Sequence, residues 1–247
     1  MLKIYLLRHG TTIFNTQDTV QGWNDSPLTE NGQFQAKCAG YGLRETKFEK
    51  CYSGDLPRQI NTAKLFLSEN MHNTSIIEDM HFREMNYGKY QFGTYFDMLN
   101  PLFLANNATY CGYTGLYKYM DDVEIATQIA LRDETGQTEG PIKLWNRFKQ
   151  GLDNITNNDD GNILLSTSSC AIAVVIKNLF PDFKQDGLVD NCSITVISYK
   201  DGQYSLEDYD GWIDRYVNVY WEESGAERHH RASIEGSSLD YFFEEYK

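Results

Sequence analysis

Short apolar runs alternate with amphipathic stretches along most of the chain. The runs at 2–7, 50–53, 75–78, 162–166 and 193–199 predict strands. Apolar residues recur at helical spacing near 29–41, 59–68, 141–155 and 171–179, which predicts helices. Strands that alternate with helices predict an α/β fold: a three-layer sandwich with a mostly parallel central sheet and helices on both faces.

The helical spacing also predicts which side chains face the core. Thr29 is expected to cap the first helix at its N-terminus. The expected core positions of the first three helices are Phe34, Cys38 and Tyr41, then Ile60, Ala63 and Leu67, then Leu144, Phe148, Leu152 and Ile155.

Two segments depart from the alternation. Residues 86–140 are rich in Tyr, Phe and Asn, and we interpret them as a cap insertion over the active edge of the sheet. A long structural loop with a helix is the alternative. The expected main domain is 1–205, and 206–247 is an acidic aromatic C-terminal extension that we expect to pack on the body. Contact with a partner is the other interpretation of that extension.

Composition narrows the function classes. The chain has 247 residues, of which 41% are hydrophobic, so a large core can form. The formal net charge of −13 argues against a nucleic-acid-binding protein, because such proteins usually present a basic surface. The negative charge of the protein would repel an anionic substrate at long range, so arginines at the binding site would have to outweigh that repulsion.

The cysteines indicate a reducing compartment. There are five, an odd number, and none forms a C-x-x-C pair, so we expect reduced thiols in a cytoplasmic protein. The first apolar run is too short for a signal peptide, and no stretch approaches the length of a membrane span. We expect no metal and no cofactor, because no ligand spacing is present. The sequence is compatible with a homodimer and otherwise silent on oligomeric state.

Arg8-His9-Gly10 follows the first predicted strand directly. Ligands of open α/β sheets bind beyond the carboxyl ends of strands, so His9 is well placed for catalysis. A histidine there can attack phosphorus through a ring nitrogen, and a neighbouring guanidinium can hold phosphoryl oxygens. An ordinary loop Arg-His pair is the alternative.

Further motifs accompany this turn. Thr12 and Asn15 complete R-H-G-x-T-x-x-N, and Q-G-W-N-D-S-P-L-T-E-N-G covers residues 21–32. S-G-D-L-P-R ends at Arg58, R-E-M-N-Y-G contains Glu84, and N-C-S at 191–193 precedes the last predicted strand. Over most of residues 1–199 the chain resembles the histidine phosphatase superfamily, with its phosphoglycerate-mutase-like fold. R-H-G alone is a weak signal, but its spacing from the second block is specific.

The resemblance implies roles for the matching residues. His9 would be the nucleophile, Arg8 and Arg58 the phosphoryl clamps, and Asn15 a polar phosphate contact. Glu84 would be the general acid that protonates the leaving oxygen. A surface salt bridge for Arg58 and a solvent-exposed Glu84 are the plainer alternatives. Gln91 stands where many relatives carry a second glutamate.

One expected histidine is missing. The family ends its later buried strand with a second histidine and a glycine, where this chain has Thr167 and Ser168. Their hydroxyls could donate neutral hydrogen bonds to a phosphoryl group. Losing one preorganised donor costs a factor on the order of 10²–10³ in rate, so we expect a weakened site. Substitution by His81, His229 or His230 and a nucleophilic Cys170 remain minor alternatives.

Three functions follow from these observations. The first is a phosphomonoester hydrolase that acts through a phosphohistidine at His9, with a small phosphorylated metabolite as substrate and neither nucleic acid nor membrane as partner. The second is a phosphoglycerate mutase, although the cap carries only Lys89, Lys118 and Arg132 between Gly88 and Gln137. The third is a non-catalytic phospho-ligand-binding protein, which the Thr167 substitution favours.

Overall fold

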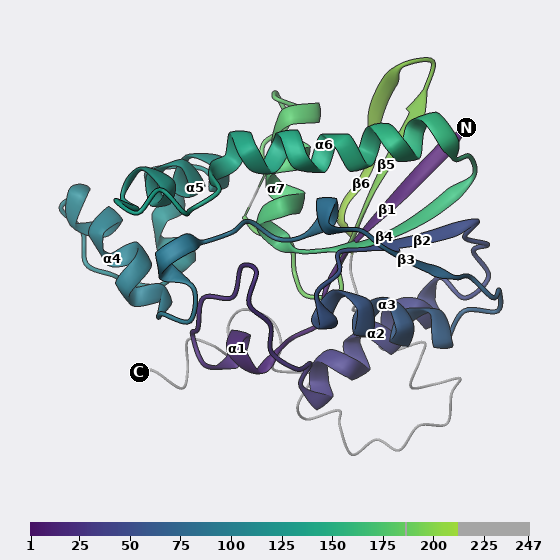
Figure 1. Cartoon of the computed structure of the whole chain (residues 1–247), viewed down its shortest axis with the longest axis horizontal. Coiled ribbons are helices and arrows are strands. Elements are labelled where there is room, and N and C mark those ends of the chain that lie inside the picture. The colour runs from purple at the N-terminus through teal and green to yellow at the C-terminus, as the bar shows by residue number, and fades with distance from the viewer. Residues whose placement is uncertain (186, 212–247) are drawn as a thin grey trace.

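A six-stranded mixed sheet forms the centre of the protein in the computed structural model, which describes residues 1–185 and 187–211 (Figure 1). The strands are β1 (Leu2–Arg8), β2 (Lys50–Ser53), β3 (Ile76–Glu78), β4 (Asn162–Thr167), β5 (Ile194–Lys200) and β6 (Gln203–Gly211). Their order is β3-β2-β4-β1-β5-β6, in which the first four are parallel and the last two antiparallel to their neighbours. The α/β fold with a mostly parallel sheet is therefore confirmed.

Helices cover both faces of the sheet (Figure 1). On one face lie α6 (Gly140–Asn158) and α7 (Ser169–Leu179), and on the other lie α2 (Glu30–Gly42) and α3 (Pro57–Ser68). Thr29 caps α2 as expected, since its side chain accepts a hydrogen bond from the Gly32 N–H at 3.0 Å. The four predicted core residues of α6 are all buried.

The predicted faces of α2 and α3 are only partly buried: Ala63 is buried in α3, whereas Ile60 and Leu67 are half-buried. In α2 only Cys38 of the three expected residues is buried, and the rest of the packed face consists of Gly32, Ala36, Ala39 and Gly40. A Cβ at Gly40 would overlap the backbone of Phe66 in α3. The two helices therefore approach so closely that small residues make the contact, and the larger side chains lie at its margin.

Helical segments fill the stretch at 86–140. They are the short 3₁₀ segments η2 (Gly88–Tyr90) and η3 (Tyr113–Lys118), and the helices α4 (Tyr95–Ala105) and α5 (Asp122–Leu131). Figure 1 shows α4 and α5 beyond the carboxyl ends of the parallel strands. Leu102 and Ile125 belong to the same apolar cluster as Leu144 and Val174 of the sandwich, so this segment shares a core with the sheet.

Strand β6 crosses the expected domain boundary at residue 205, so the sheet continues to Gly211. The hydrophobic pattern does not predict this strand, because it lies at the edge of the sheet and its residues are all half-buried or exposed. The rest of the expected extension, 212–247 with His229 and His230, lies outside the described residues.

Two motif glycines meet at the loop that follows β1. A Cβ on Gly10 would overlap the Gly32 carbonyl, and a Cβ on Gly32 would overlap the backbone of Thr11. The loop after β1 therefore lies directly on the first turn of α2. This contact explains physically why both sequence blocks contain a glycine at these positions.

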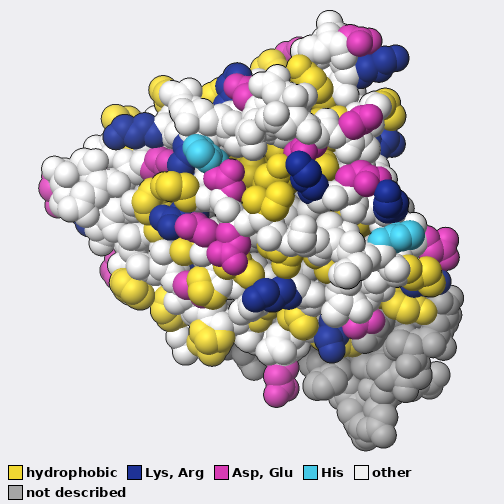
Figure 2. Space-filling view, turned by 45° about the vertical axis from the view of Figure 1, so that its right-hand side comes forward, with side chains coloured by type: hydrophobic (Ala, Val, Ile, Leu, Met, Phe, Trp, Pro, Cys, Tyr) yellow, Lys and Arg dark blue, Asp and Glu magenta, His cyan; other side chains and the backbone are white. Residues whose placement is uncertain are grey.

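The surface carries charges of both signs. On the face shown in Figure 2, lysines and arginines are scattered among acidic and apolar side chains and form no continuous basic patch. No helix in the described residues is long and apolar enough to cross a bilayer. All five cysteines are free thiols.

Candidate active site

His9 lies immediately beyond the carboxyl end of β1, with only 4% of its surface exposed. Its Nδ1 is 2.9 Å from the Gly10 carbonyl oxygen. Because a carbonyl can only accept, Nδ1 carries the proton and Nε2 is left with a lone pair. Burial lowers the pKa of His9 well below its usual range, and the charges of Arg58 and Arg8 act in the same direction. The side chain is thus a neutral imidazole.

Both arginines predicted to bind phosphate lie beside His9. Nη1 of Arg8 donates to the Val189 carbonyl at 2.5 Å. Arg58, at 1% exposure, donates to the carbonyls of Gly22 and Asn24 and to Asp25. The Nε atoms of both arginines are buried and have no hydrogen-bond partner among the described residues. Terminal nitrogens of both side chains are thus held by protein acceptors, whereas the Nε–H groups are unbonded within the described chain.

Glu84 is buried at the N-terminus of α7. Its Oε1 accepts from the Met85 N–H at 2.7 Å and the Ala171 N–H at 3.0 Å, and its Oε2 accepts from the Cys170 N–H at 3.2 Å. Burial raises the pKa of Glu84, while the Met85 N–H and the charge of Arg58 oppose this shift. The surface alternative for Glu84 is excluded, since only 7% of the residue is exposed.

Thr167 and Ser168 end β4, next to β1. Thr167 pairs with Arg8 in the sheet, and its carbonyl accepts from the His9 N–H at 3.0 Å. Its hydroxyl donates to the Phe82 carbonyl at 2.8 Å, so that proton already has an acceptor. The Ser168 hydroxyl accepts from Gln59 at 3.0 Å, which leaves its own proton available. Of the two expected neutral donors, only Ser168 is free to donate in this arrangement.

Asn15 lies in the loop after β1, within the short helix α1 (Ile13–Thr16). Its side-chain oxygen accepts from the N–H and the hydroxyl of Thr12, both at 3.0 Å, which closes a capping box. If Asn15 contacts phosphate, its carboxamide NH₂ is therefore the group that would donate to a phosphoryl oxygen.

The structure does not favour Cys170 as the nucleophile or His81 as a replacement for the second histidine. Burial raises the pKa of Cys170 well above its usual range, so this residue is a neutral thiol and a poor nucleophile. His81, in the 3₁₀ segment η1 (Met80–Phe82), has its Nδ1 2.6 Å from an oxygen of Asp79 and is half-buried. No contact joins it to His9 in the described part of the chain.

The site also contains residues to which the sequence motifs gave no role. The Thr62 hydroxyl accepts from the Gly10 N–H at 3.0 Å, and Asn191 donates to the His9 carbonyl at 2.8 Å. Burial raises the pKa of Tyr95 to about 12, and the charges of Arg8 and Glu84 also act on it. Tyr95 therefore places a protonated phenol among the charged groups of the site.

Arg147 of α6 holds the segment that carries Glu84. Its guanidinium donates to the Glu84 carbonyl at 3.1 Å and pairs with Glu139 at 2.7 Å. It also donates to three further carbonyls, those of Met80, His81 and Arg83. Trp23 donates to the same Glu84 carbonyl at 2.8 Å, and its ring lies under Arg83 and Arg147. The position of the candidate acid thus depends on a helix 63 residues away in sequence.

Replacing Arg147 with alanine should lower the free energy of unfolding by roughly 3 kcal/mol, because the largely buried Glu139 carboxylate would lose its cation. Urea denaturation monitored by circular dichroism measures this change. Lys149→Ala on the same helix is the control, since its ion pair with Asp153 is exposed and is worth about 0.5 kcal/mol or less. Equal effects of the two substitutions would contradict the proposed role of Arg147.

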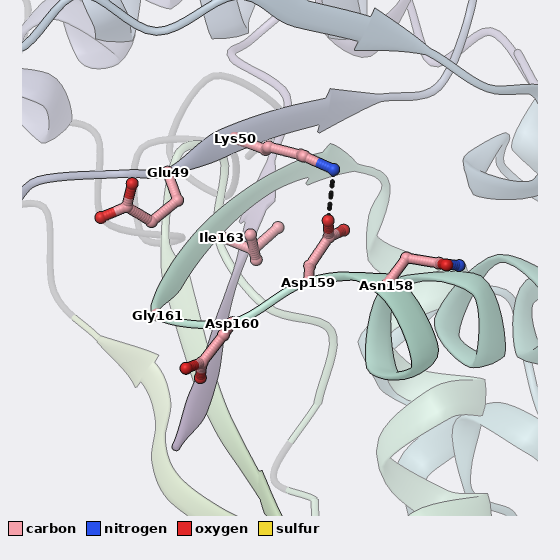
Figure 3. Close-up of a pocket in the computed structure, with 7 residues that line it drawn as sticks. All are labelled: Glu49, Lys50, Asn158, Asp159, Asp160, Gly161 and Ile163. Carbon is pink, nitrogen blue, oxygen red and sulfur yellow. Dashed lines mark hydrogen bonds and ion pairs between the residues drawn. The ribbon is translucent and has the colours of Figure 1, made fainter.

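A pocket of about 390 Å³ lies at the other end of the sheet (Figure 3). It is lined by Lys50 and Ile163, near the amino ends of β2 and β4, and by three acidic residues. Lys50 is paired with Asp159, and Asp160 with the N-terminal ammonium group. This pocket contains neither a histidine nor a free guanidinium, so it does not compete with the His9 cluster as a phosphate site.

The chain is similar in sequence to the histidine phosphatase superfamily and to phosphoglycerate mutases. The model of the histidine phosphatase superfamily (branch 1) matches residues 4–104. The chain is 41% identical over 70 residues to a 2,3-bisphosphoglycerate-dependent phosphoglycerate mutase of Methanococcus vannielii, a match that covers 28% of this chain and 30% of that protein. It is 36% identical over 88 residues to a probable phosphoglycerate mutase of Erwinia tasmaniensis, which covers 36% of this chain and 40% of the relative. These matches thus span less than half of each curated relative.

Solved structures extend the likeness to nearly the whole described chain. A phosphoglycerate mutase from Bacillus anthracis is 30% identical and superimposes with a TM-score of 0.79, over 87% of this chain and 95% of that one. A mycobacterial glucosyl-3-phosphoglycerate phosphatase shares the fold at 21% identity, with a TM-score of 0.68 over 85% and 99% of the two chains. These names are those of enzymes, both mutases and phosphatases. The chain belongs to the histidine phosphatase superfamily.

Proposed function

We propose that the protein is a phosphomonoester hydrolase in which Nε2 of His9 is the nucleophile. The observation that carries this proposal is the neutral imidazole, whose Nδ1–H is held by the Gly10 carbonyl beside two guanidinium groups. A neutral histidine can attack phosphorus without first losing a proton. Arg8 and Arg58 then offset the negative charge of the phosphoryl oxygens in a site that excludes bulk water.

The reaction has two steps. In the first, Nε2 forms a bond to phosphorus, the bond to the leaving oxygen breaks, and Glu84 gives its proton to that oxygen. In the second, Glu84 takes a proton from water, the water oxygen bonds to phosphorus and the P–N bond breaks. The N–H groups of Met85, Cys170 and Ala171 support the carboxylate form that Glu84 has between the two steps.

The charges around the site favour hydrolysis over mutase activity. A mutase must bind a substrate carboxylate in addition to the phosphoryl group, which calls for additional cations. In the cap, Lys89 is paired with Glu134, Arg132 is bonded to Gln128, and Lys118 is exposed. Next to Glu84, Arg83 is neutralised by Asp55 and Arg147 by Glu139. Arg8 and Arg58 are thus the guanidinium groups at this site that keep an unbonded, buried N–H.

Mutase activity is the second candidate, because the Bacillus anthracis structure at 30% identity carries that name. The two functions separate in one assay. The protein is incubated with p-nitrophenyl phosphate, sugar phosphates and 3-phosphoglycerate, and both phosphate release and isomerisation of 3-phosphoglycerate are measured. Phosphate release, with a phosphoryl group trapped on the peptide that contains His9 after acid-free quenching, supports the hydrolase. Isomerisation faster than release would replace it with the mutase. Phosphate binding without either reaction would leave the non-catalytic function.

We further propose that Thr167 stands at the place of the family's second histidine and weakens the site. Thr167→His should then raise kcat by at least about 10-fold, because a donor is restored next to the phosphoryl group. The position is fully buried, so the larger ring should also cost about 1–3 kcal/mol of stability. Steady-state kinetics and thermal unfolding measure the two effects. Thr167→Met matches the added bulk without a donor, and an equal rate gain in that variant would refute the argument.

A further inference from the structure

Asp122, the first residue of α5, is a carboxylate buried in the cap, with 3% of the residue exposed. It accepts hydrogen bonds from the Tyr117 hydroxyl at 2.9 Å and the Tyr113 hydroxyl at 3.2 Å. Asp122 has no ion pair among the described residues. Lys177 forms an ion pair with the neighbouring Asp121. Burial raises the pKa of Asp122 to about 6, and the two phenols oppose this shift. Burying an acid whose hydrogen-bond partners are two phenols costs free energy, so the contacts of Asp122 call for an explanation.

The Tyr117 hydroxyl joins this acid to a second segment. A phenol has one proton, and here it is donated to Asp122. The oxygen of the same hydroxyl accepts the Leu188 N–H at 3.0 Å, across 71 residues of sequence. The Tyr117 ring also lies against Gly187, whose φ of +97° is a conformation that favours glycine. Tyr117 thus fixes the chain at 187–188 through both its hydroxyl and its ring.

That segment leads directly to the phosphate site. The Val189 carbonyl, one residue further along, accepts from Nη1 of Arg8 at 2.5 Å. The Cys192 N–H donates to the Arg8 carbonyl at 3.1 Å, and Asn191 holds the His9 carbonyl. The Val189 carbonyl that accepts from Arg8 thus follows closely along the chain from the Leu188 N–H that the Tyr117 hydroxyl accepts.

We propose that Asp122 and Tyr117 are positioning residues that connect the cap to Arg8 and set its orientation for the phosphoryl group. We call this chain of contacts, from Asp122 through Tyr117 and Leu188–Val189 to Arg8, the cap latch. It rests on the phosphate-binding role proposed for Arg8. Removing the Tyr117 hydroxyl takes away one of the contacts that hold residues 187–190, beside those of Tyr209 with the Gly187 carbonyl and of Asp210 with the Asp190 N–H. The direction of the guanidinium is then less firmly held, while its charge is retained.

The chain contains a matched control. Tyr113 and Tyr117 both donate to Asp122, but only the Tyr117 hydroxyl contacts Leu188. Tyr117→Phe and Tyr113→Phe therefore each remove one phenol from the same acid, and they differ in the latch. Loss of one hydrogen bond is worth about 0.5–1.5 kcal/mol, which corresponds to a change of about 2- to 10-fold in binding.

Two measurements on the full chain test the latch. Calorimetric titration with inorganic phosphate should show a 2- to 10-fold higher Kd for Tyr117→Phe. Asp122→Asn should change the Kd in the same direction, and Tyr113→Phe should leave it close to that of the original protein. Hydrogen exchange of the peptide that contains 187–193 should be faster in Tyr117→Phe and Asp122→Asn than in Tyr113→Phe. Thermal unfolding verifies that the variants are folded.

Equal phosphate Kd values for Tyr113→Phe and Tyr117→Phe would overturn the latch, as would unchanged exchange at 187–193 in Tyr117→Phe. Failure of the proposed function gives a different result, in which the original protein binds no phosphate. In that case the exchange data still decide whether Tyr117 holds the Leu188 segment, and the phosphate-binding part of the proposal falls with the function on which it rests.

Discussion

Replacing His9 with alanine should lower kcat for every phosphomonoester by about 10⁴-fold or more, since the variant has no atom on which to form the covalent intermediate. The change removes a neutral imidazole whose Nδ1–H is hydrogen-bonded to the Gly10 carbonyl. Arg8 and Arg58 remain, so the Kd for inorganic phosphate should change far less than kcat. Single-turnover kinetics and calorimetric titration measure the two quantities separately.

His81→Ala is the control for this experiment. His81 is half-buried and bonded to Asp79, and it is the described alternative to a second site histidine. A full loss of turnover in His81→Ala, or residual turnover above about 1% in His9→Ala, would contradict the assignment of His9 as nucleophile.

Replacing Glu84 with glutamine should lower kcat by about 10²–10³-fold for alkyl phosphates, whose leaving oxygen needs a proton. The loss should be much smaller for p-nitrophenyl phosphate, because nitrophenolate leaves without protonation. The acid must be protonated in the first step, and burial raises its pKa. The rate of the original protein should therefore persist to higher pH than for an ordinary glutamate, and then fall as pH rises through that pKa.

The pH profile gives this prediction its sharpest form. In Glu84→Gln the falling limb at high pH should vanish for alkyl phosphates, because an amide does not titrate. Glu78→Gln, which changes an exposed acid at the end of β3, provides the comparison and should keep the limb. An equal loss for alkyl and nitrophenyl substrates would argue that Glu84 holds α7 in place and does not donate a proton.

The sheet and the first half of the site followed from local pattern. The apolar run of β1 and the Arg-His-Gly turn lie together in sequence, so their joint position at a strand end was predictable. The core face of α2 was not, because the close contact of Gly40 with the backbone of Phe66 places small residues at this helix interface. The periodicity of apolar residues indicates which side of a helix is buried, but it does not indicate how closely two helix backbones approach each other.

The contacts that orient the candidate catalytic groups were also hidden from the sequence. Arg147 reaches Glu84 across 63 residues, and Tyr117 reaches Leu188 across 71. Neither residue belongs to a motif, and an arginine in a helix or a tyrosine in a short 3₁₀ segment can have many other roles. Sequence spacing identifies groups that act on a substrate, whereas the groups that position them become visible only when the chain is folded.

The mutual contact of Gly10 and Gly32 has a consequence for building hybrid proteins. Each glycine leaves room for the backbone near the other, so the loop after β1 and the start of α2 must fit each other sterically. A chimera that takes residues 1–20 from one relative and α2 from another combines two backbone segments that need not fit each other sterically. A crossover point after α2 takes both segments from the same parent protein, and it is therefore the better position in a recombination library.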